Sequence, residues 1–146
     1  MSKVRFGMAG VLCALVLGQP LAAWSEALFD VSGTRLTTQQ ITATFSDTLD
    51  RGEVLDAPGT RAETHWLGNG SFSTRWWRGN ERGKAVGVWQ ARDGKRCVQL
   101  EAFDTLQDSV WYCGKVLRRA DGRYVSFNPD GTVHGLHELE PLKNKD

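Results

Sequence analysis

The chain has 146 residues, of which 24% are charged, and its 18 basic and 17 acidic side chains leave a formal net charge of +1. This length suits one ordinary domain. Because no run of like charge forms a basic tail or stripe, the sequence argues against electrostatic binding of DNA or RNA.

The first residues have the order of a secretory signal peptide. Lys3 and Arg5 form a short positive segment, and an uncharged, largely apolar run follows over residues 6–18. This run is about 13 residues long, whereas a membrane-spanning helix needs about 20, so we expect no stable membrane anchor. Cleavage after Ser25 fits the preference for small residues best, with sites two residues to either side as alternatives. We therefore expect a signal peptide at 1–25, one domain at 26–146 and a periplasmic or secreted location.

Two cysteines, Cys97 and Cys113, lie beyond this signal, whereas Cys13 lies inside it. In an oxidising compartment an even pair predicts a disulfide. Closing a loop of about 15 residues contributes on the order of 3 kcal/mol in the chain-entropy account. Two metal-ligating thiols are the alternative, but the close C-x-x-C spacing and the nearby histidines of zinc sites are missing. We therefore predict a disulfide, with no metal site and no cofactor.

One helix is predicted soon after this mature start. Thr37 and Gln40 match a capping box, in which each side chain bonds the other residue's backbone N–H. Ile41, Phe45 and Leu49 then recur every fourth residue, and a helix ending at Gly52 is expected. We interpret the acids late in this segment and after it as a solvated face and loop rather than a catalytic pair: Asp47, Asp50, Glu53 and Asp56.

For the remainder of the chain, the sequence predicts short strands separated by tight turns. The turn dipeptides favour positive φ and are Asn69-Gly70, Asp93-Gly94, Asp121-Gly122 and Asp130-Gly131. Between them we predict strands at 62–67, 71–77, 85–91, 96–102, 109–118, 123–127 and 132–138. This spacing predicts a mainly β fold, an antiparallel meander of about six to seven strands with one N-terminal helix. The meander would curl into a barrel or a strongly twisted sheet.

The cysteine pair also predicts a register. If Cys97 lies directly opposite Cys113 in a hairpin, the chain turns around Thr105 and alternate residues share a face. One face is apolar and is predicted as core: Val98, Leu100, Val110, Tyr112 and Val116. The other face is more polar, which places the disulfide on an outer or rim face: Cys97, Gln99, Glu101, Trp111 and Lys115.

The histidines do not form a recognisable site in the sequence. His134 and His137 are three residues apart, and in a strand such residues point to opposite faces, so joint ligation is not expected. His65 has no predicted neighbour among them. The chain also lacks a nucleophile elbow, a Walker loop, a dinucleotide fingerprint and an H-E-x-x-H helix. We predict no catalytic residue from motifs of this kind.

The most unusual feature is an aromatic and basic concentration over residues 66–89. Because strand neighbours face opposite ways, we predict Trp76 in the core and Trp77 exposed. An exposed tryptophan between Arg75 and Arg78 can stack on a sugar ring or on the apolar edge of a ligand, so these three residues form a candidate binding site. The alternative is ordinary packing of tryptophans in a small barrel core.

Four segments carry a resemblance: G-V-W-Q-A-R-D-G-K-R-C-V (87–98), W-Y-C-G-K-V (111–116), D-G-R-Y (121–124) and N-P-D-G-T-V (128–133). They resemble small exported bacterial domains of unknown function, in which an N-terminal helix precedes a G-x-W…C…C…G-x-Y…D-G strand series. The likeness covers roughly residues 35–140. It departs at Asn69-Gly70-Ser71, where a D-G-T-type turn is expected. The resemblance implies export, a disulfide and a compact β fold, and it transfers no catalytic residue.

These observations favour a non-catalytic binding module that presents a β surface or barrel mouth to a protein, a glycan or a small apolar ligand. One alternative is a cell-envelope hydrolase that uses carboxylates near the 103–108 loop, such as Glu101, Asp104 and Asp108. Another is an exported enzyme inhibitor whose hairpin loop enters a cleft. A mouth lined by tryptophans would favour a small ligand, and a closed core would favour protein–protein binding.

Overall fold

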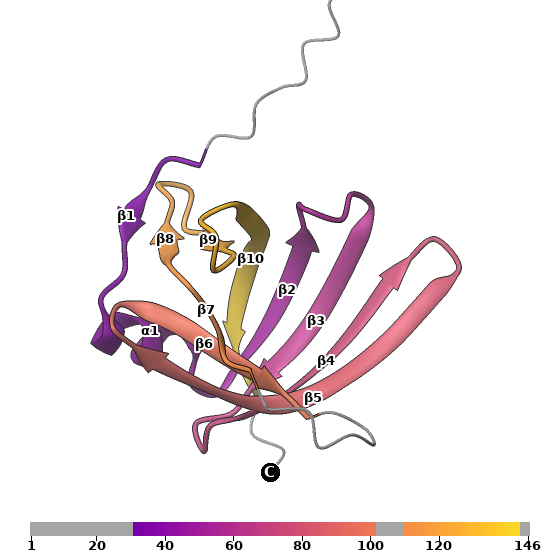
Figure 1. The fold of residues 1–146 in the computed structure, drawn as a ribbon, viewed down its shortest axis with the longest axis horizontal. Helices are drawn as coiled ribbons and strands as arrows, with labels where there is room; N and C mark the ends of the chain where they lie inside the picture. The colour runs from indigo at the N-terminus through magenta and orange to yellow at the C-terminus, as the bar shows by residue number, and fades with distance from the viewer. Residues whose placement is uncertain (1–30, 102–109, 144–146) are drawn as a thin grey trace, which may run out of the picture.

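The computed structural model describes residues 31–101 and 110–143. They form one helix and a ten-stranded antiparallel sheet that curls into a half-barrel (Figure 1). The mainly β prediction is confirmed, with ten strands rather than six to seven. The strands are β1 (Thr34–Arg35), β2 (Thr48–Val54), β3 (Thr60–Trp66), β4 (Ser71–Arg78), β5 (Glu81–Arg92), β6 (Lys95–Leu100), β7 (Tyr112–Gly114), β8 (Val116–Arg118), β9 (Tyr124–Phe127) and β10 (Val133–Pro141). Their order across the sheet is β1-β8-β9-β10-β2-β3-β4-β5-β6-β7.

The predicted strand 109–118 is divided in the structure, and the division shapes the half-barrel. β7 pairs with β6 at one edge of the sheet, whereas β8 pairs with β9 near the other edge. Only Lys115 separates β7 from β8, so one short segment joins the two ends of the sheet. The backbones approach closely here, because a Cβ on Gly114 would collide with the Phe127 carbonyl oxygen.

The helix begins as predicted but ends earlier. α1 (Thr38–Phe45) starts at Thr37, and both hydrogen bonds of the capping box are present. Thr48 Oγ1 then donates to the Phe45 carbonyl at 2.8 Å, and Asp47 adopts a left-handed φ of 56°. The chain therefore turns into β2, and the prediction that the helix continues to Gly52 is wrong.

The buried core lies between α1 and the sheet. Ile41 and Phe45 are fully buried and pack in one cluster with Leu36, Trp66, Phe72, Trp89 and Val116. The Phe45 ring meets the Trp66 ring edge-on at a centroid distance of 5.8 Å. Full burial of an aliphatic or aromatic side chain stabilises a fold by about 1.5–3 kcal/mol. In the part of the chain described, no helix combines the length and apolar character needed to cross a bilayer.

The disulfide prediction is confirmed, and its register with it. Cys97 is bonded to Cys113, and the neighbouring pair is Val98 with Tyr112. The assignment of faces needs correction. Cys97 is fully buried rather than exposed at a rim, and three predicted core residues are about half exposed: Leu100, Val110 and Tyr112. Leu100 and Tyr112 line an open cavity instead of a closed core, and the turn predicted around Thr105 lies outside the described residues.

Candidate functional site

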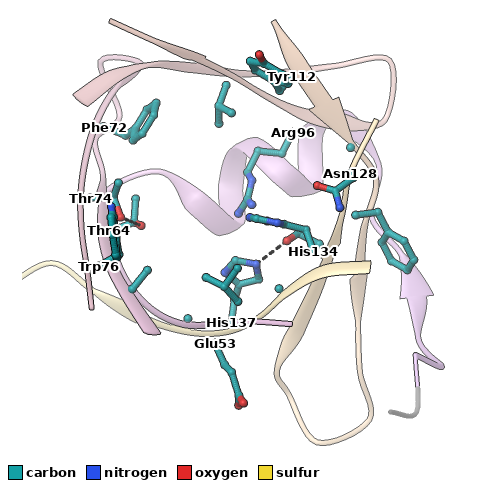
Figure 2. A pocket seen from close by; sticks show the side chains of 18 of the residues that line it. Glu53, Thr64, Phe72, Thr74, Trp76, Arg96, Tyr112, Asn128, His134 and His137 are labelled. Atoms are coloured by element: carbon teal, nitrogen blue, oxygen red, sulfur yellow. Dashed lines mark hydrogen bonds between the residues drawn. The ribbon is translucent and has the colours of Figure 1, made fainter. Parts of the chain in front are cut away.

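The concave side of the half-barrel holds a cavity of about 520 Å³. Inward-facing positions of several strands supply its apolar lining: Trp66, Phe72, Trp76, Val98, Leu100 and Tyr112. Figure 2 shows Phe72, Thr74 and Trp76 along one wall, with Arg96 and His137 reaching into the cavity from other strands. The cavity is therefore an amphipathic site with a mainly apolar wall and a small polar group.

Arg96 is the one Lys or Arg among the described residues that line this cavity. Its guanidinium carbon lies 4.7 Å from the ring centroids of both Phe45 and Trp66, so two aromatic faces hold it. Nη1 is shut off from solvent and has no hydrogen-bond partner within the described residues. Burial lowers the pKa of Arg96, while the nearby Asp50 carboxylate raises it. An arginine keeps its charge in such a setting, so the wall of the cavity contains a cation with a buried, unpaired donor.

Three polar side chains, Asp50, His137 and Ser126, form a chain of hydrogen bonds that starts at the Trp66 ring and reaches the cavity. The Trp66 indole N–H donates to Asp50 Oδ2 at 3.0 Å, and the same oxygen lies 2.8 Å from His137 Nδ1. On the far side of the imidazole, His137 Nε2 lies 2.7 Å from Ser126 Oγ. All three polar residues are buried, Asp50 with 2% exposure. They come from the adjacent strands β2, β10 and β9.

The interpretation of Asp50 as a solvated acid is wrong. Because α1 ends at Phe45, Asp50 lies in β2 and faces inward instead of extending a helix face. Burial raises the pKa of its carboxyl, but the interactions with His137, Arg96 and Trp66 together outweigh burial, so the pKa lies below its ordinary value. Asp50 is therefore held as a carboxylate inside the cavity wall.

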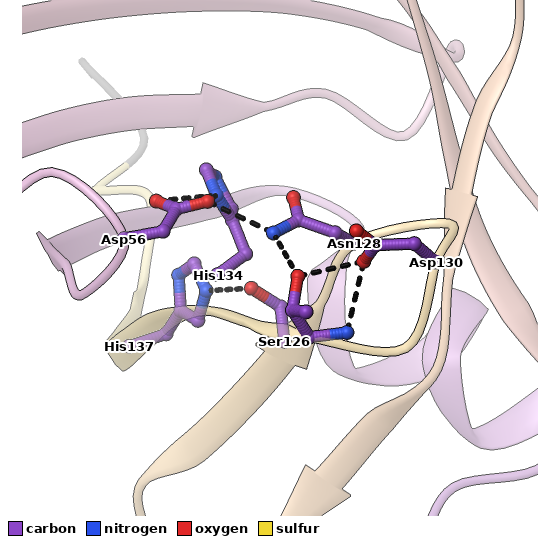
Figure 3. A network of polar contacts seen from close by, with 7 residues as sticks. Asp56, Ser126, Asn128, Asp130, His134 and His137 are labelled. Carbon is purple, nitrogen blue, oxygen red and sulfur yellow. Dashed lines mark hydrogen bonds and ion pairs between the residues drawn. The ribbon is translucent and has the colours of Figure 1, made fainter.

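The prediction that His134 and His137 face opposite ways is also wrong, since both line the cavity. A β-bulge at this point of β10 inserts one residue between Val133 and Gly135, which disrupts the alternation of faces. His134 Nδ1 lies 3.0 Å from Asp56 Oδ2, and Asn128 donates to the same oxygen at 2.9 Å (Figure 3). Burial raises the pKa of Asp56, but the hydrogen bonds with His134 and Asn128 help to bring this pKa below its ordinary value.

The binding site predicted at Trp77, Arg75 and Arg78 lies on the other side of the sheet. Arg75 pairs with Glu63 at 2.9 Å, and Arg78 pairs with Glu81 at 2.8 Å. Trp77 is half-buried and lines a second hollow of about 620 Å³ together with Arg82 and Lys84. Both arginines thus have acidic partners, and a ligand role for this patch stays a prediction.

The other predicted candidates are spread apart. Trp76 faces inward as predicted but is half-buried at the cavity wall, because the half-barrel is open there. Glu101 is exposed, and its suggested partners Asp104 and Asp108 lie outside the described residues. His65 is exposed on β3. No group of three metal-ligating side chains occurs in residues 31–101 and 110–143.

Sequence reasoning missed Arg96 and Ser126, although a signal for each was present. Arg96 has the same strand parity as Val98 and Leu100, so the predicted register already placed a cation on an apolar face. Ser126 lies between the apolar residues Val125 and Phe127, in a strand that is buried throughout its last three positions. Comparison of the chain with protein-family models, curated proteins and solved structures gave no match. The function must therefore be inferred from the geometry of the cavity.

Proposed function

We propose that this protein is an exported binding protein whose half-barrel cavity takes one small amphipathic ligand, with its apolar part against the aromatic wall and an anionic group on Arg96. The unpaired, buried Nη1 of Arg96 is the observation that carries this proposal. Export to the periplasm or beyond is supported by the signal-like N-terminus and by a disulfide that suits an oxidising compartment.

The cavity suits the apolar part of such a ligand. Its volume of about 520 Å³ lies within the roughly 300–1,000 Å³ typical of small-molecule sites. Trp66, Phe72 and Trp76 offer aromatic surface from β3 and β4. Large, rigid rings give contact area with little loss of side-chain freedom, which favours a small organic ligand over a flat protein partner.

The anionic group of the ligand is inferred from the buried, unpaired donor of Arg96. A buried donor without a partner costs about 1–3 kcal/mol, and more when the group is charged. A carboxylate or similar anion would accept from Nη1 and compensate the buried charge. Because Phe45 and Trp66 already hold the guanidinium, little side-chain entropy remains to be lost on binding.

The test uses three ligands with the same alkyl chain: dodecanoate, dodecan-1-ol and dodecyltrimethylammonium. Each is titrated below its micellar concentration, and binding is followed by calorimetry and by tryptophan fluorescence. We expect dodecanoate to bind at least about tenfold more tightly than the alcohol, because a charged hydrogen bond contributes about 1.5–3 kcal/mol. The cationic amphiphile should bind most weakly.

Arg96→Met keeps an apolar chain of similar length and should abolish the preference for the acid. Arg75→Met, on the outer side of the sheet, is the matched control and should leave the preference unchanged. Equal affinity of all three ligands would refute the anionic subsite. Loss of binding in Trp77→Ala but not in Arg96→Met would instead place the ligand at the patch predicted from the sequence.

A further inference from the structure

The neutral form of His137 gives a defined direction to the hydrogen bonds around it. Asp50 is a carboxylate and can only accept, so His137 Nδ1 must carry a proton and donate to it. When the imidazole is neutral, Nε2 is the acceptor, and the Ser126 hydroxyl, 2.7 Å away, can donate to it. The chain therefore runs from a hydroxyl to a base to an orienting carboxylate.

The Ser126 hydroxyl, at one end of these hydrogen bonds, lies at the cavity wall. Ser126 and His137 both line it, whereas Asp50 lies behind them and does not. Within the described residues, Ser126 Oγ has no hydrogen-bond partner besides His137. Once its proton points to Nε2, the Oγ lone pairs are directed elsewhere and are left without a donor. Because Ser126 lines the cavity, these lone pairs are candidate contacts for a group bound there.

Arg96 supplies a donor in the same cluster. Its guanidinium stacks on the Trp66 ring, and the N–H of that ring bonds Asp50. The charges of Arg96 and Asp50 are close enough for each to alter the pKa of the other. The free Nη1 of Arg96 is thus a candidate to stabilise negative charge that develops on a carbonyl oxygen in the cavity.

We propose that Ser126, His137 and Asp50 form a hydrolytic triad that cleaves carboxylic esters with an apolar acyl chain. The order of atoms is that of a nucleophile, a general base and an orienting acid, and such triads are recognised by geometry rather than by sequence position. The proposal rests on the proposed function only in its use of the same cavity. The anionic ligand bound by Arg96 is then the carboxylate product.

The reaction balances with water as the only co-reactant. Ser126 Oγ bonds the acyl carbon while its proton passes to His137 Nε2, and the oxyanion accepts from Arg96 Nη1. The ester C–O bond breaks as Nε2 returns the proton to the leaving alkoxide, which leaves an acyl-serine and an alcohol. Water, deprotonated by His137, attacks the acyl-serine in the same way. This step releases the carboxylic acid and restores the Ser126 hydroxyl.

Ser126 and His137 are the catalytic residues, and Asp50 is a positioning residue. Asp50 never touches the substrate, but it fixes the proton on Nδ1 and so leaves Nε2 free to act as the base. The side chain introduced by Asp50→Asn can present an amide hydrogen to Nδ1, which favours the other tautomer. This change should lower the rate of acylation and alter its pH profile while Ser126 stays in place.

The test exposes the full exported protein, with its disulfide formed, to an alkyl fluorophosphonate, which reacts with activated serines. We expect one adduct, located on Ser126 by peptide mass spectrometry, and slow release of p-nitrophenolate from p-nitrophenyl octanoate. Ser126→Ala should abolish both signals, whereas Ser73→Ala, at an exposed serine of β4, should change neither. His137→Gln and Asp50→Asn should lower the labelling rate by about 10²–10⁴-fold, the usual contribution of general base catalysis.

Dodecanoate binding by the same variants separates this proposal from the binding proposal and shows that each variant is folded. Ser126→Ala should still bind the acid. Folded protein that binds dodecanoate but is not labelled at Ser126 would overturn the triad and leave the binding function intact. Labelling at Ser126 without any acid binding would support the triad and refute the anionic subsite.

Discussion

Arginine side chains have different environments on the two faces of the half-barrel. On the convex face, Arg51 lies 2.7 Å from Glu140 and 3.7 Å from Glu63, which also pairs with Arg75. These side chains are accessible to water, so each pair contributes about 0–1 kcal/mol. On the concave face, Arg96 is clamped between two rings and has a buried donor without a partner. Burial of a charged side chain without a hydrogen-bond partner destabilises the fold. Arg96 therefore indicates a functional site more strongly than the ion-paired arginines of the convex face do.

Removing one acid from each face gives the largest expected contrast. Asp50→Ala deprives the Trp66 N–H and His137 of their buried acceptor and should cost about 3–5 kcal/mol of unfolding free energy. Glu63→Ala removes the partly exposed partner of two arginines and should cost no more than about 1 kcal/mol. Urea unfolding followed by tryptophan fluorescence measures both values. Similar losses from the two variants would show that the buried chain is not energetically distinct.

A second contrast compares the neighbouring tryptophans of β4. Trp76 lines the cavity, so Trp76→Ala should weaken dodecanoate binding by about 1–3 kcal/mol, in the range of an aromatic hot spot. Trp77 does not line this cavity, so Trp77→Ala should leave this affinity unchanged. Calorimetric titration gives both affinities. The reverse result would move the ligand to the convex face.

The third comparison is the pH dependence of the unfolding free energy in the natural protein and in Asp50→Asn. We expect the smallest effect here, because protonation leaves the Asp50 carboxyl group in place. The pKa of Asp50 is lower in the folded state than its ordinary value of 3.8, so the unfolded chain binds the proton more readily. The stabilisation by Asp50 is therefore complete above about pH 4 and is lost as the pH falls through the folded pKa. Unfolding free energies measured between pH 6 and pH 2 should fall less steeply for Asp50→Asn than for the natural protein. Parallel curves would contradict a lowered pKa.

Local signals explain which predictions succeeded. The capping box places the start of α1, because its two hydrogen bonds form within four residues. The predicted turn glycines Gly70, Gly94, Gly122 and Gly131 all have positive φ, which needs no contact from elsewhere in the chain. The pairing of Cys97 with Cys113 sets the register of β6 and β7, because a disulfide and strand alternation together leave one solution.

The short elements could therefore be predicted from the amino-acid sequence: the mainly β composition, the turns, the beginning of the helix and the cross-linked pair. The direction in which their side chains point depends on the packing of the whole chain. The early end of α1 turns Asp50 inward, the bulge in β10 brings His134 and His137 to one side, and Arg96 receives its rings from α1 and β3. Backbone preferences act over a few residues, whereas the partners of an inward side chain come from distant strands. The cavity and its polar side chains therefore depend on contacts between distant strands and could not be predicted from local sequence patterns.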